Sequence, residues 1–406
     1  MLMKYVDVIM TASLETIQGP VQTIKRLRNN ADFYRSNGYE LSFFTLDNLS
    51  ETVIQKIRAN DSLLVRRLKE FARFLALHSW VYSWYRVRHL FTSSHRVLKY
   101  YKSLERTPDI IVFHSIMDCY MYLKYYKIDG VKVSLFTHSD GLIFKMLLLY
   151  YPRLIGGPID RKLKSIANYV MSNVDVKPCI ARIEERNLLQ NFPQLAGKTC
   201  LVINAIDDLT EEQKQISSVI KSQAKDIKYR LVCSGSINGR KGQWMIIDAL
   251  NRLPKEKLQD FHLTLIGDGP ERITLEDKVS RYGLTEYVTF TGALANTEVY
   301  KKLSESNIYI LMSLNEGLPI SLIEAMRNGM ALISTNVSGI PELINENKNG
   351  KLINPNVDDL YDLLLRFNEY NWDEMGDESR SFYEKNFVFT RMRSDYLNML
   401  NKAFEE

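Results

Sequence analysis

The feature that most constrains the fold of this chain is a series of short apolar runs that lack polar alternation. In the second half the runs are RLVCS, HLTLIG, YVTF, IYILMS and ALIST, at residues 230–234, 262–267, 287–290, 308–313 and 331–335. Unalternated runs of four to six residues are typical of strands covered on both faces, which occur in parallel sheets. A stretch with helical patterning follows most of these runs. The repeated order of strand and helix predicts a doubly wound α/β domain.

The first half has the same order of elements with longer insertions between them. Its expected strands cover residues 5–10, 41–45, 109–113, 133–136 and 200–204. A chain of 406 residues is also too long for one ordinary hydrophobic core. We therefore expect two doubly wound domains, joined in the polar stretch 208–225. In open α/β sheets ligands bind beyond the carboxyl ends of the strands, so the expected site is a cleft between the two domains.

One loop that follows such a strand, NEGLPISLIEAM at residues 315–326, places two glutamates on either side of an expected helix start. Pro319 suits the first helical position, and the amides near Gly317 and Leu318 can bind an anion. Side chains tilt toward a helix N-terminus, so Glu324 can reach a group beside that anion. A nucleoside-diphosphate sugar fits this pattern, with Glu324 on the ribose and Glu316 on the sugar. Alternatively, Glu316 only caps a helix dipole and Glu324 is a solvated surface residue.

A second loop, CSGSINGRKG at residues 233–242, ends with the adjacent cations Arg240 and Lys241 before an expected helix. Cations in this position can neutralise a diphosphate leaving group, whose charge grows as the glycosidic bond breaks. A basic surface turn explains the same residues equally well. The sequence GDGP at residues 267–270 indicates, by itself, only a tight turn.

The charge of the chain is distributed unevenly. The net charge of +5 is too small to indicate a nucleic-acid partner. Residues 56–106, however, hold twelve Lys or Arg against three acidic residues, interleaved with aromatic residues. This pattern is typical of interfacial helices on anionic lipid. A solvated face packed on the domain and an RNA contact are the alternatives, and nothing else in the sequence favours RNA.

The cellular compartment follows from the cysteines and from the apolar runs. The four cysteines, Cys119, Cys179, Cys200 and Cys233, form no C-x-x-C pair and are expected to be buried in a reducing compartment. No run of 18 uncharged apolar residues occurs, so we expect no membrane-spanning helix. The predicted location is cytoplasmic, peripheral on the inner face of the cell membrane.

Taken together, several segments in a fixed order resemble the retaining glycosyltransferases of family 4, which have the GT-B fold (glycosyl transferases group 1). The matching segments are GSINGRKG, GDGP, VTFTG and SLNEGLPISLIEAMRNGM, followed by SGIPELI and NGKLI. They lie between residues 232 and 353. The order and spacing of the segments make the resemblance more specific than any single motif.

The resemblance is weaker in the first half. NAID at residues 204–207 is similar to the family's junction motif, with Ala205 in place of glycine. His138 matches a histidine that contacts the donor sugar, and Gly19 falls in the family's glycine-rich loop. Two departures matter: Gly19 is followed by proline, and Ser236 replaces an arginine of the phosphate loop. Arg240 is the expected substitute for that missing charge.

The resemblance implies a GT-B enzyme with two Rossmann-like domains facing across a cleft. Residues 1–210 form the acceptor-binding domain, with the basic aromatic insertion at about 51–106, and residues 211–380 bind the nucleotide-sugar. Residues 381–406 form a helix that returns to the N-terminal domain. The reaction is hexosyl transfer from a nucleotide-sugar, with a UDP-sugar favoured, to a hydroxyl of a glycan or lipid-linked acceptor, with retention of configuration.

The implied residue roles are specific. His138 and Glu316 are catalytic, and the donor is bound by Gly19, Arg240, Lys241, Glu316, Gly317, Leu318 and Glu324. No cofactor, no metal and no nucleic acid is expected; the partners are the donor, the acceptor and an anionic membrane surface met by residues 56–106. The implied pathway is bacterial surface polysaccharide or glycoconjugate synthesis. Two alternatives remain: a non-catalytic GT-B partner subunit that binds glycan or membrane, and a nucleotide-sugar epimerase.

Overall fold

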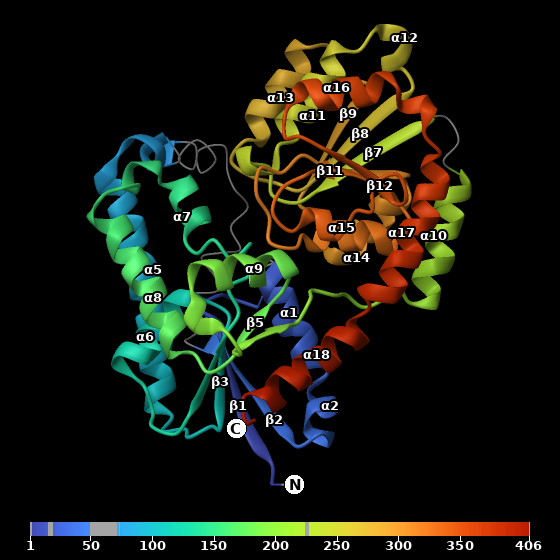
Figure 1. Cartoon of the computed structure of the whole chain (residues 1–406). Coiled ribbons are helices and arrows are strands. Elements are labelled where there is room, and N and C mark those ends of the chain that lie inside the picture. The colour runs from blue at the N-terminus through green and yellow to red at the C-terminus, as the bar shows by residue number, and fades with distance from the viewer. Residues whose placement is uncertain (1, 15–18, 49–70, 73, 224–226, 406) are drawn as a thin grey trace. The chain divides into compact units, whose positions relative to one another are not determined.

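The structure, a computed structural model, consists of two compact units. It describes residues 2–14, 19–48, 71–72, 74–223 and 227–405. Unit 1 contains residues 1–204 and 393–406, and unit 2 contains residues 205–392 (Figure 1). Both units have the alternation of strands and helices that the apolar runs predict.

Unit 1 is built on a parallel sheet with the strand order β2-β1-β3-β4. The strands are β1 (Lys4–Ile9), β2 (Tyr39–Phe44), β3 (Ile110–Phe113), β4 (Lys132–Leu135), β5 (Lys177–Cys179) and β6 (Thr199–Leu201). Val6 lies opposite Leu41 on one side and Ile110 on the other. Strands β5 and β6 pair with each other, and the bridge between Ser134 and Val176 connects them to β4.

Helices cover both faces of this sheet because its central strands are apolar on both sides, and all four residues of β3 are buried. The α-helices are α1 (Gly19–Asn29), α2 (Ala31–Ser36), α5 (Trp80–Ser103), α6 (Ile116–Tyr125), α7 (Lys145–Tyr150), α8 (Pro158–Asn173), α9 (Arg182–Asn191) and most of α18 (Phe389–Lys402). Short 3-10 helices are η1 (Leu46–Asn48), η2 (Pro152–Leu154) and η3 (Pro193–Leu195). Figure 1 shows α5, α6 and α8 on one face, and α1, α2 and α18 on the other.

Unit 2 is a six-stranded parallel sheet with the order β12-β11-β10-β7-β8-β9. The strands are β7 (Tyr229–Ser234), β8 (Phe261–Ile266), β9 (Val288–Gly292), β10 (Ile308–Leu311), β11 (Ala331–Thr335) and β12 (Gly350–Ile353). The strand order reverses at β7 and β10, where Ile308 lies opposite Leu231. In a doubly wound sheet this reversal is where ligands bind.

The helices of unit 2 also form two layers. They are α10 (Glu211–Gln223), α11 (Gln243–Arg252), α12 (Lys255–Leu258), α13 (Arg272–Arg281), α14 (Asn296–Ser304), α15 (Ile320–Arg327), α16 (Val357–Leu365) and α17 (Trp372–Asn386). The 3-10 helices are η4 (Gly239–Lys241), η5 (Ile340–Glu342) and η6 (Phe367–Glu369). Helices α11 and α16 pack together on one face, and α15 and α17 pack together on the other (Figure 1).

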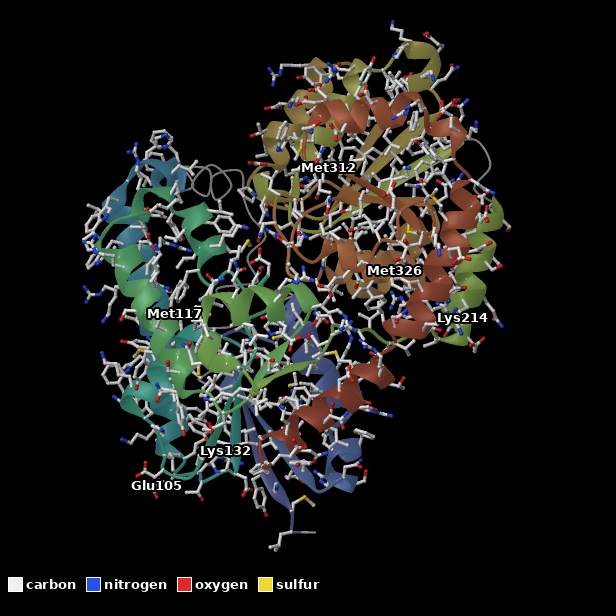
Figure 2. The ribbon with its side chains drawn as sticks, in the orientation of Figure 1. Glu105, Met117, Lys132, Lys214, Met312 and Met326 are labelled. Atoms are coloured by element: carbon white, nitrogen blue, oxygen red, sulfur yellow. The ribbon has the colours of Figure 1, made fainter. Side chains whose placement is uncertain are left out.

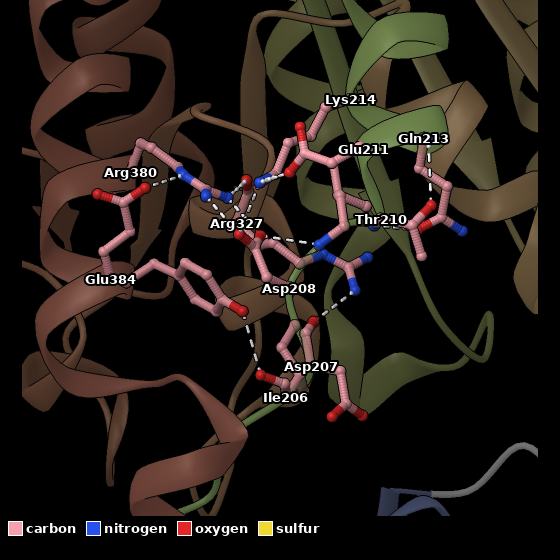
Figure 3. Close-up of polar contacts among 12 residues, drawn as sticks. Ile206, Asp207, Asp208, Thr210, Glu211, Gln213, Lys214, Arg327, Arg380 and Glu384 are labelled. Atoms are coloured by element: carbon pink, nitrogen blue, oxygen red, sulfur yellow. Dashed lines mark hydrogen bonds and ion pairs between the residues drawn. The ribbon is translucent and has the colours of Figure 1, made fainter.

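A cluster around Arg380 joins the start of unit 2 to its last long helix (Figure 3). The Arg380 guanidinium on α17 donates to both carboxylate oxygens of Asp208 at 2.7 Å, and to the carbonyl oxygen of Arg327 at 2.7 Å. The Tyr383 hydroxyl donates to the Ile206 carbonyl oxygen at 3.1 Å. A bidentate arginine–carboxylate pair is geometrically specific, so this cluster fixes where the chain enters unit 2.

These contacts also account for the domain boundaries. The sequence predicted breaks after residues 210 and 380, whereas the structure divides the chain after Asn204 and after Met392. Residues 381–392 belong to unit 2 because α17 continues to Asn386, where Tyr383 and Phe387 are buried. The stretch from Arg393 returns to unit 1, where Tyr396 stacks on Phe136 at 5.8 Å.

The described part of the basic insertion is dominated by α5. Residues 49–70 and 73 lie outside the described residues. One side of α5 is buried, including Val87, Val97 and Leu98, so the packed-face interpretation holds for that side. The other side exposes Trp80, Val81, Trp84, Tyr85 and Leu90. In the part of the chain that the structure describes, no helix has both the length and the apolarity needed to cross a bilayer.

Candidate active site

The loop after β7 is shaped by its glycines. Gly235 has a φ of +136° and Gly242 a φ of +68°, backbone conformations that favour glycine. A Cβ on Gly242 would collide with the carbonyl oxygen of Met312, the residue that follows β10 (Figure 2). The side chain of Asn238 accepts a hydrogen bond from the Lys241 amide at 3.2 Å and so caps η4. Glycine at position 242 therefore allows this loop to pack closely against the carboxyl end of the neighbouring strand β10.

The GDGP turn after β8 packs on the same loop. A Cβ on Gly267 would meet the Gly235 carbonyl oxygen, and one on Gly269 would meet that of Ile237. The Ile237 amide donates to the Asp268 carbonyl oxygen at 3.0 Å. The two turns that the sequence treats as separate motifs are therefore one packed layer at the switch point of the sheet.

Glu316 joins this layer to the loop after β10 through one carboxylate oxygen. Its Oε1 lies 2.7 Å from Lys241 Nζ and 2.8 Å from an Arg240 guanidinium nitrogen, and it accepts a hydrogen bond from Ser313 Oγ at 2.7 Å. The same Arg240 nitrogen donates to the Asn315 carbonyl oxygen at 2.7 Å. Two cations from one loop thus converge on one carboxylate from the other.

The electrostatics of this cluster keep Glu316 ionised. Burial alone would raise the pKa of its carboxyl group. The positive charges of Lys241 and Arg240, together with the hydrogen bonds from Lys241 and Ser313, outweigh burial and hold the pKa below its ordinary value. The cluster therefore consists of one buried carboxylate and two cations. It carries one net positive charge at the ends of the strands.

The helix after this loop begins one residue later than the sequence predicted. Pro319 is the N-cap of α15, with an extended backbone, and Ile320 is its first residue. Gly317 and Leu318 precede this cap, and Leu318 is buried. Glu324 lies in the second turn of α15 and is half-buried. Six of the predicted donor residues therefore lie in the segments that follow β7 and β10 of unit 2. They are Arg240, Lys241, Glu316, Gly317, Leu318 and Glu324.

The predicted residues His138 and Gly19 belong to unit 1. His138 follows β4 and has a left-handed backbone with a φ of 48°. Its Nε2 lies 2.8 Å from Nδ1 of His114, which follows β3, so one imidazole donates to the other. Gly19 is the first residue of α1, and the residues before it, 15–18, lie outside the described residues.

Both imidazoles are neutral near pH 7. Burial, with a smaller effect of the Lys177 charge, lowers the pKa of His138 to about 3. Burial and the neighbouring His138 hold the pKa of His114 well below its ordinary value. The His114 ring also stacks on Phe136 at 4.8 Å, so its orientation is fixed by packing. His138 can therefore act as a neutral hydrogen-bonding group at neutral pH.

A buried ion pair of Lys177 and Glu184 acts on His138: the Lys177 charge contributes to its lowered pKa, and Glu184 contacts the adjacent Thr137. Lys177 Nζ lies 3.2 Å from Glu184 Oε1, and both side chains are fully buried. Glu184 also accepts hydrogen bonds from the Ile180 amide at 2.7 Å and from the Thr137 hydroxyl. The pair is hydrogen-bonded on both partners, which is the condition for a buried ion pair to be tolerated.

Sequence reasoning missed four residues of these clusters: Ser313, Asn315, Asn238 and His114. Ser313 and Asn315 flank Glu316, but the sequence does not say that they contact Glu316 or its cations. His114 could have been found by the signal that identified His138, because it too is a polar residue directly after an apolar strand. Among the described residues, no group of three His, Cys, Asp or Glu is placed to hold a metal ion.

Comparison with known proteins finds a family-model match within unit 2. Residues 214–384 match the family model described as glycosyl transferases group 1. An uncharacterised glycosyltransferase of Methanocaldococcus jannaschii is 24% identical over 62% of this chain and 61% of its own length. A protein of Escherichia coli K12 named as a colanic acid biosynthesis glycosyltransferase, WcaL, is 30% identical over 38% of this chain and 40% of its own length. The chain thus matches less than two thirds of either relative.

One solved structure extends the likeness to both units. HepE of Anabaena, crystallised with UDP, covers 98% of this chain and 100% of its own, with a TM-score of 0.66 and 14% identity. At this identity the likeness concerns the fold, and with the two parallel sheets it shows the predicted GT-B architecture of two Rossmann-like units.

Proposed function

Because residues 214–384 of this chain match the model of the glycosyl transferases group 1 family, we propose that the protein is a retaining glycosyltransferase of family 4. The donor is a nucleotide-sugar, with a UDP-sugar favoured, and the acceptor is a hydroxyl of a glycan or lipid-linked molecule. HepE was crystallised with UDP and with UDP-glucose, which supports the choice of uridine. The name of WcaL supports a role in surface polysaccharide synthesis.

The observation that carries this proposal is the convergence of Arg240 and Lys241 on Glu316. Two cations at the switch point of the sheet match the charge of a diphosphate. Arg240 lies beside Lys241 although Ser236 stands where the family has its arginine, so the second charge is supplied from the other end of the loop. Helix amides and fixed cations stabilise a departing diphosphate without reorganising during the reaction.

In this proposal, donor binding breaks the ion pairs of Glu316 with Lys241 and Arg240. The two cations then bind the diphosphate oxygens, and the Glu316 carboxylate accepts hydrogen bonds from the sugar hydroxyls. Glu324 takes the ribose, and the amides near Gly317 and Leu318 meet the phosphate. We do not assign Glu316 a role as a covalent nucleophile. Retention then follows a front-face path in which the departing phosphate helps to take the acceptor proton.

In unit 1, the neutral His138 donates or accepts a hydrogen bond at the donor sugar, and Gly19 lies in the loop near the phosphates and the acceptor. No metal or cofactor is required, because Arg240 and Lys241 supply the positive charge. The exposed aromatic and basic side of α5 rests on an anionic membrane, which places the enzyme at the cytoplasmic face of the cell membrane.

The test is hydrolysis of a panel of sugar nucleotides by the full chain, followed by tritium or mass-spectrometric detection of released sugar. We expect one UDP-sugar to be hydrolysed and Glu316→Ala to abolish this hydrolysis. Asp358→Ala is the matched control, because Asp358 lies in an ion pair on the surface of the same unit. If no donor is bound or hydrolysed, or if Glu316→Ala changes nothing, the non-catalytic partner subunit becomes the better explanation.

A further inference from the structure

Unit 1 contains a groove that none of the donor residues touches. It has a volume of about 540 Å³, within the range of small-molecule sites, and lies between the loop after β4, α7, α8 and α9. Its apolar lining includes Leu142, Ile143, Leu148, Leu149, Ile155 and Phe192. This groove begins three residues after His138, so the loop that carries the candidate catalytic histidine also forms the groove wall.

The lining of the groove also contains charged residues. Asp160 is buried and faces the groove, with its Oδ2 accepting from the Gly156 amide at 2.8 Å and from Lys164 Nζ at 3.2 Å. Its Oδ1 has no hydrogen-bond partner among the described residues, although the atom is buried. A buried acceptor without a partner costs free energy unless a ligand or water supplies a donor. The second lysine at the groove, Lys145, pairs with Asp140 at 3.4 Å.

The apolar side of the groove continues onto the surface. Leu149 and Ile155 line the groove and are more than half exposed, at 53% and 59%. Leu154, between them, packs with Val87 of α5 and Met117 of α6, so this segment is joined to the exposed aromatic helix. Large apolar side chains exposed together on a soluble unit indicate an interaction surface.

The charge of the residues around the groove indicates which class of ligand it can bind. Residues 140–164 contain five Lys or Arg and two Asp, a net charge of +3. The Lys164 side chain is 70% exposed, so its ammonium can gain a second anionic partner. An apolar groove with lysines in its lining fits an amphiphile that has a hydrocarbon chain and a phosphate. A neutral peptide or a free sugar would use only one of these two features.

We propose that this groove binds the hydrocarbon chain of a phosphate-bearing lipid, which is the anchor of the acceptor. The chain lies against Leu148, Leu149 and Ile155, the phosphate meets Lys164, and a hydroxyl of the head group donates to Asp160 Oδ1. The inference rests on the proposed function and narrows its acceptor from a glycan or lipid-linked molecule to a lipid-linked one.

The probe is a series of single-chain alkyl phosphates of eight, ten and twelve carbons, titrated calorimetrically below their micelle concentrations. Each methylene that enters the groove should tighten binding about threefold to fourfold. Leu149→Ser combined with Ile155→Ser should weaken dodecyl phosphate binding at least tenfold and flatten the dependence on chain length. Lys164→Gln should weaken all three phosphates by a similar factor and leave the chain-length dependence intact.

Val219→Ser is the matched control, because Val219 is 55% exposed on α10 of unit 2 and far from this groove in sequence. It should bind all three phosphates as the wild type does. Circular dichroism and the thermal midpoint establish that each variant is folded, which is expected because Leu149, Ile155 and Lys164 are exposed.

Three outcomes would overturn the proposal. The first is wild-type affinity that does not depend on chain length. The second is dodecyl phosphate binding that survives the double substitution. The third is a double variant that changes the molecular mass in solution, since the groove would then hold a second copy of the chain. The titration contains no nucleotide, so its failure is distinguishable from a failure of donor hydrolysis.

Discussion

Three side chains contact a single carboxylate oxygen of Glu316, and this geometry fixes the positions of two cations. A carboxylate that accepts from Lys241, Arg240 and Ser313 at 2.7–2.8 Å holds both cations in place before any ligand arrives. Preorganised charges stabilise a transition state more effectively than charges that must move. The same contacts oppose donor binding, because the diphosphate has to replace Glu316.

Substitution of Lys241 tests whether this residue acts on the diphosphate of the donor. Lys241→Gln removes a charge-assisted contact of the kind that contributes about 1.5–3 kcal/mol. We therefore expect kcat/KM for donor hydrolysis to fall about tenfold to a hundredfold. Lys301→Gln, which removes an exposed lysine paired with Glu298, should leave it unchanged. Equal losses in the two variants would contradict a role for Lys241 at the diphosphate.

His114 should act through His138. His114→Phe keeps the ring that stacks on Phe136 but removes the nitrogen 2.8 Å from His138, which leaves a buried imidazole nitrogen without its partner. We expect kcat to fall about tenfold with little change in donor KM. His114→Asn returns a polar group near the position of Nδ1 and should recover part of kcat. A purely structural role for His114 would instead affect the folded fraction and spare kcat per folded enzyme.

At the level of elements, the apolar runs predicted the strands well because a strand covered on both faces leaves a clear signal. Strands β5 and β12 (Gly350–Ile353) were missed. Strand β5, Lys177-Pro178-Cys179, is short and contains a lysine and a proline. Lys177 is tolerated there because its ammonium pairs with Glu184 of α9 and donates to the Pro178 carbonyl oxygen. The onset of α15 shifted by one residue because proline suits an N-cap as well as the first turn.

The candidate site was predictable in its residues but not in its contacts. Motif order brought Arg240, Lys241 and Glu316 into consideration. It could not indicate that the loops after β7 and β10 are pressed together, because that depends on Gly242 and the Met312 carbonyl group. Side-chain partners that lie 76 positions apart in the sequence are set by packing, which no local pattern records.

Gly242 tests this packing directly. Gly242→Ala forces a left-handed alanine, at about 1 kcal/mol, and also places a Cβ against the Met312 carbonyl oxygen. Gly283 has a similar φ of +69° but open space around it. Gly283→Ala therefore introduces only the backbone strain of a left-handed alanine and no steric clash. We expect urea unfolding of unit 2 to show at least twice the loss of stability for Gly242→Ala. Only Gly242→Ala should weaken donor binding, and equal effects would contradict the packed loop.

At the level of the whole molecule, the two units should respond differently to acid. His114 and His138, both in unit 1, have pKa values lowered by burial, that of His138 to about 3, against about 6.5 in an unfolded chain. Between these values the unfolded chain binds more protons than the folded one. Stability therefore falls as pH drops below about 6.5, by at most about 1.4 kcal/mol per pH unit for each histidine.

Unit 2 should lose its stability later in an acid titration. It has one histidine with a lowered pKa, His262, and Glu316, whose depressed pKa preserves its contribution until pH falls below the ordinary carboxyl range. Hydrogen-exchange mass spectrometry at pH 7 and pH 5, corrected for intrinsic rates, should show protection lost first in β3 and β4. His114→Phe should reduce that loss, because one buried site no longer takes up a proton on unfolding. Earlier exposure of β7 and β10 than of β3 and β4 would contradict the assignment of the acid-sensitive groups to unit 1.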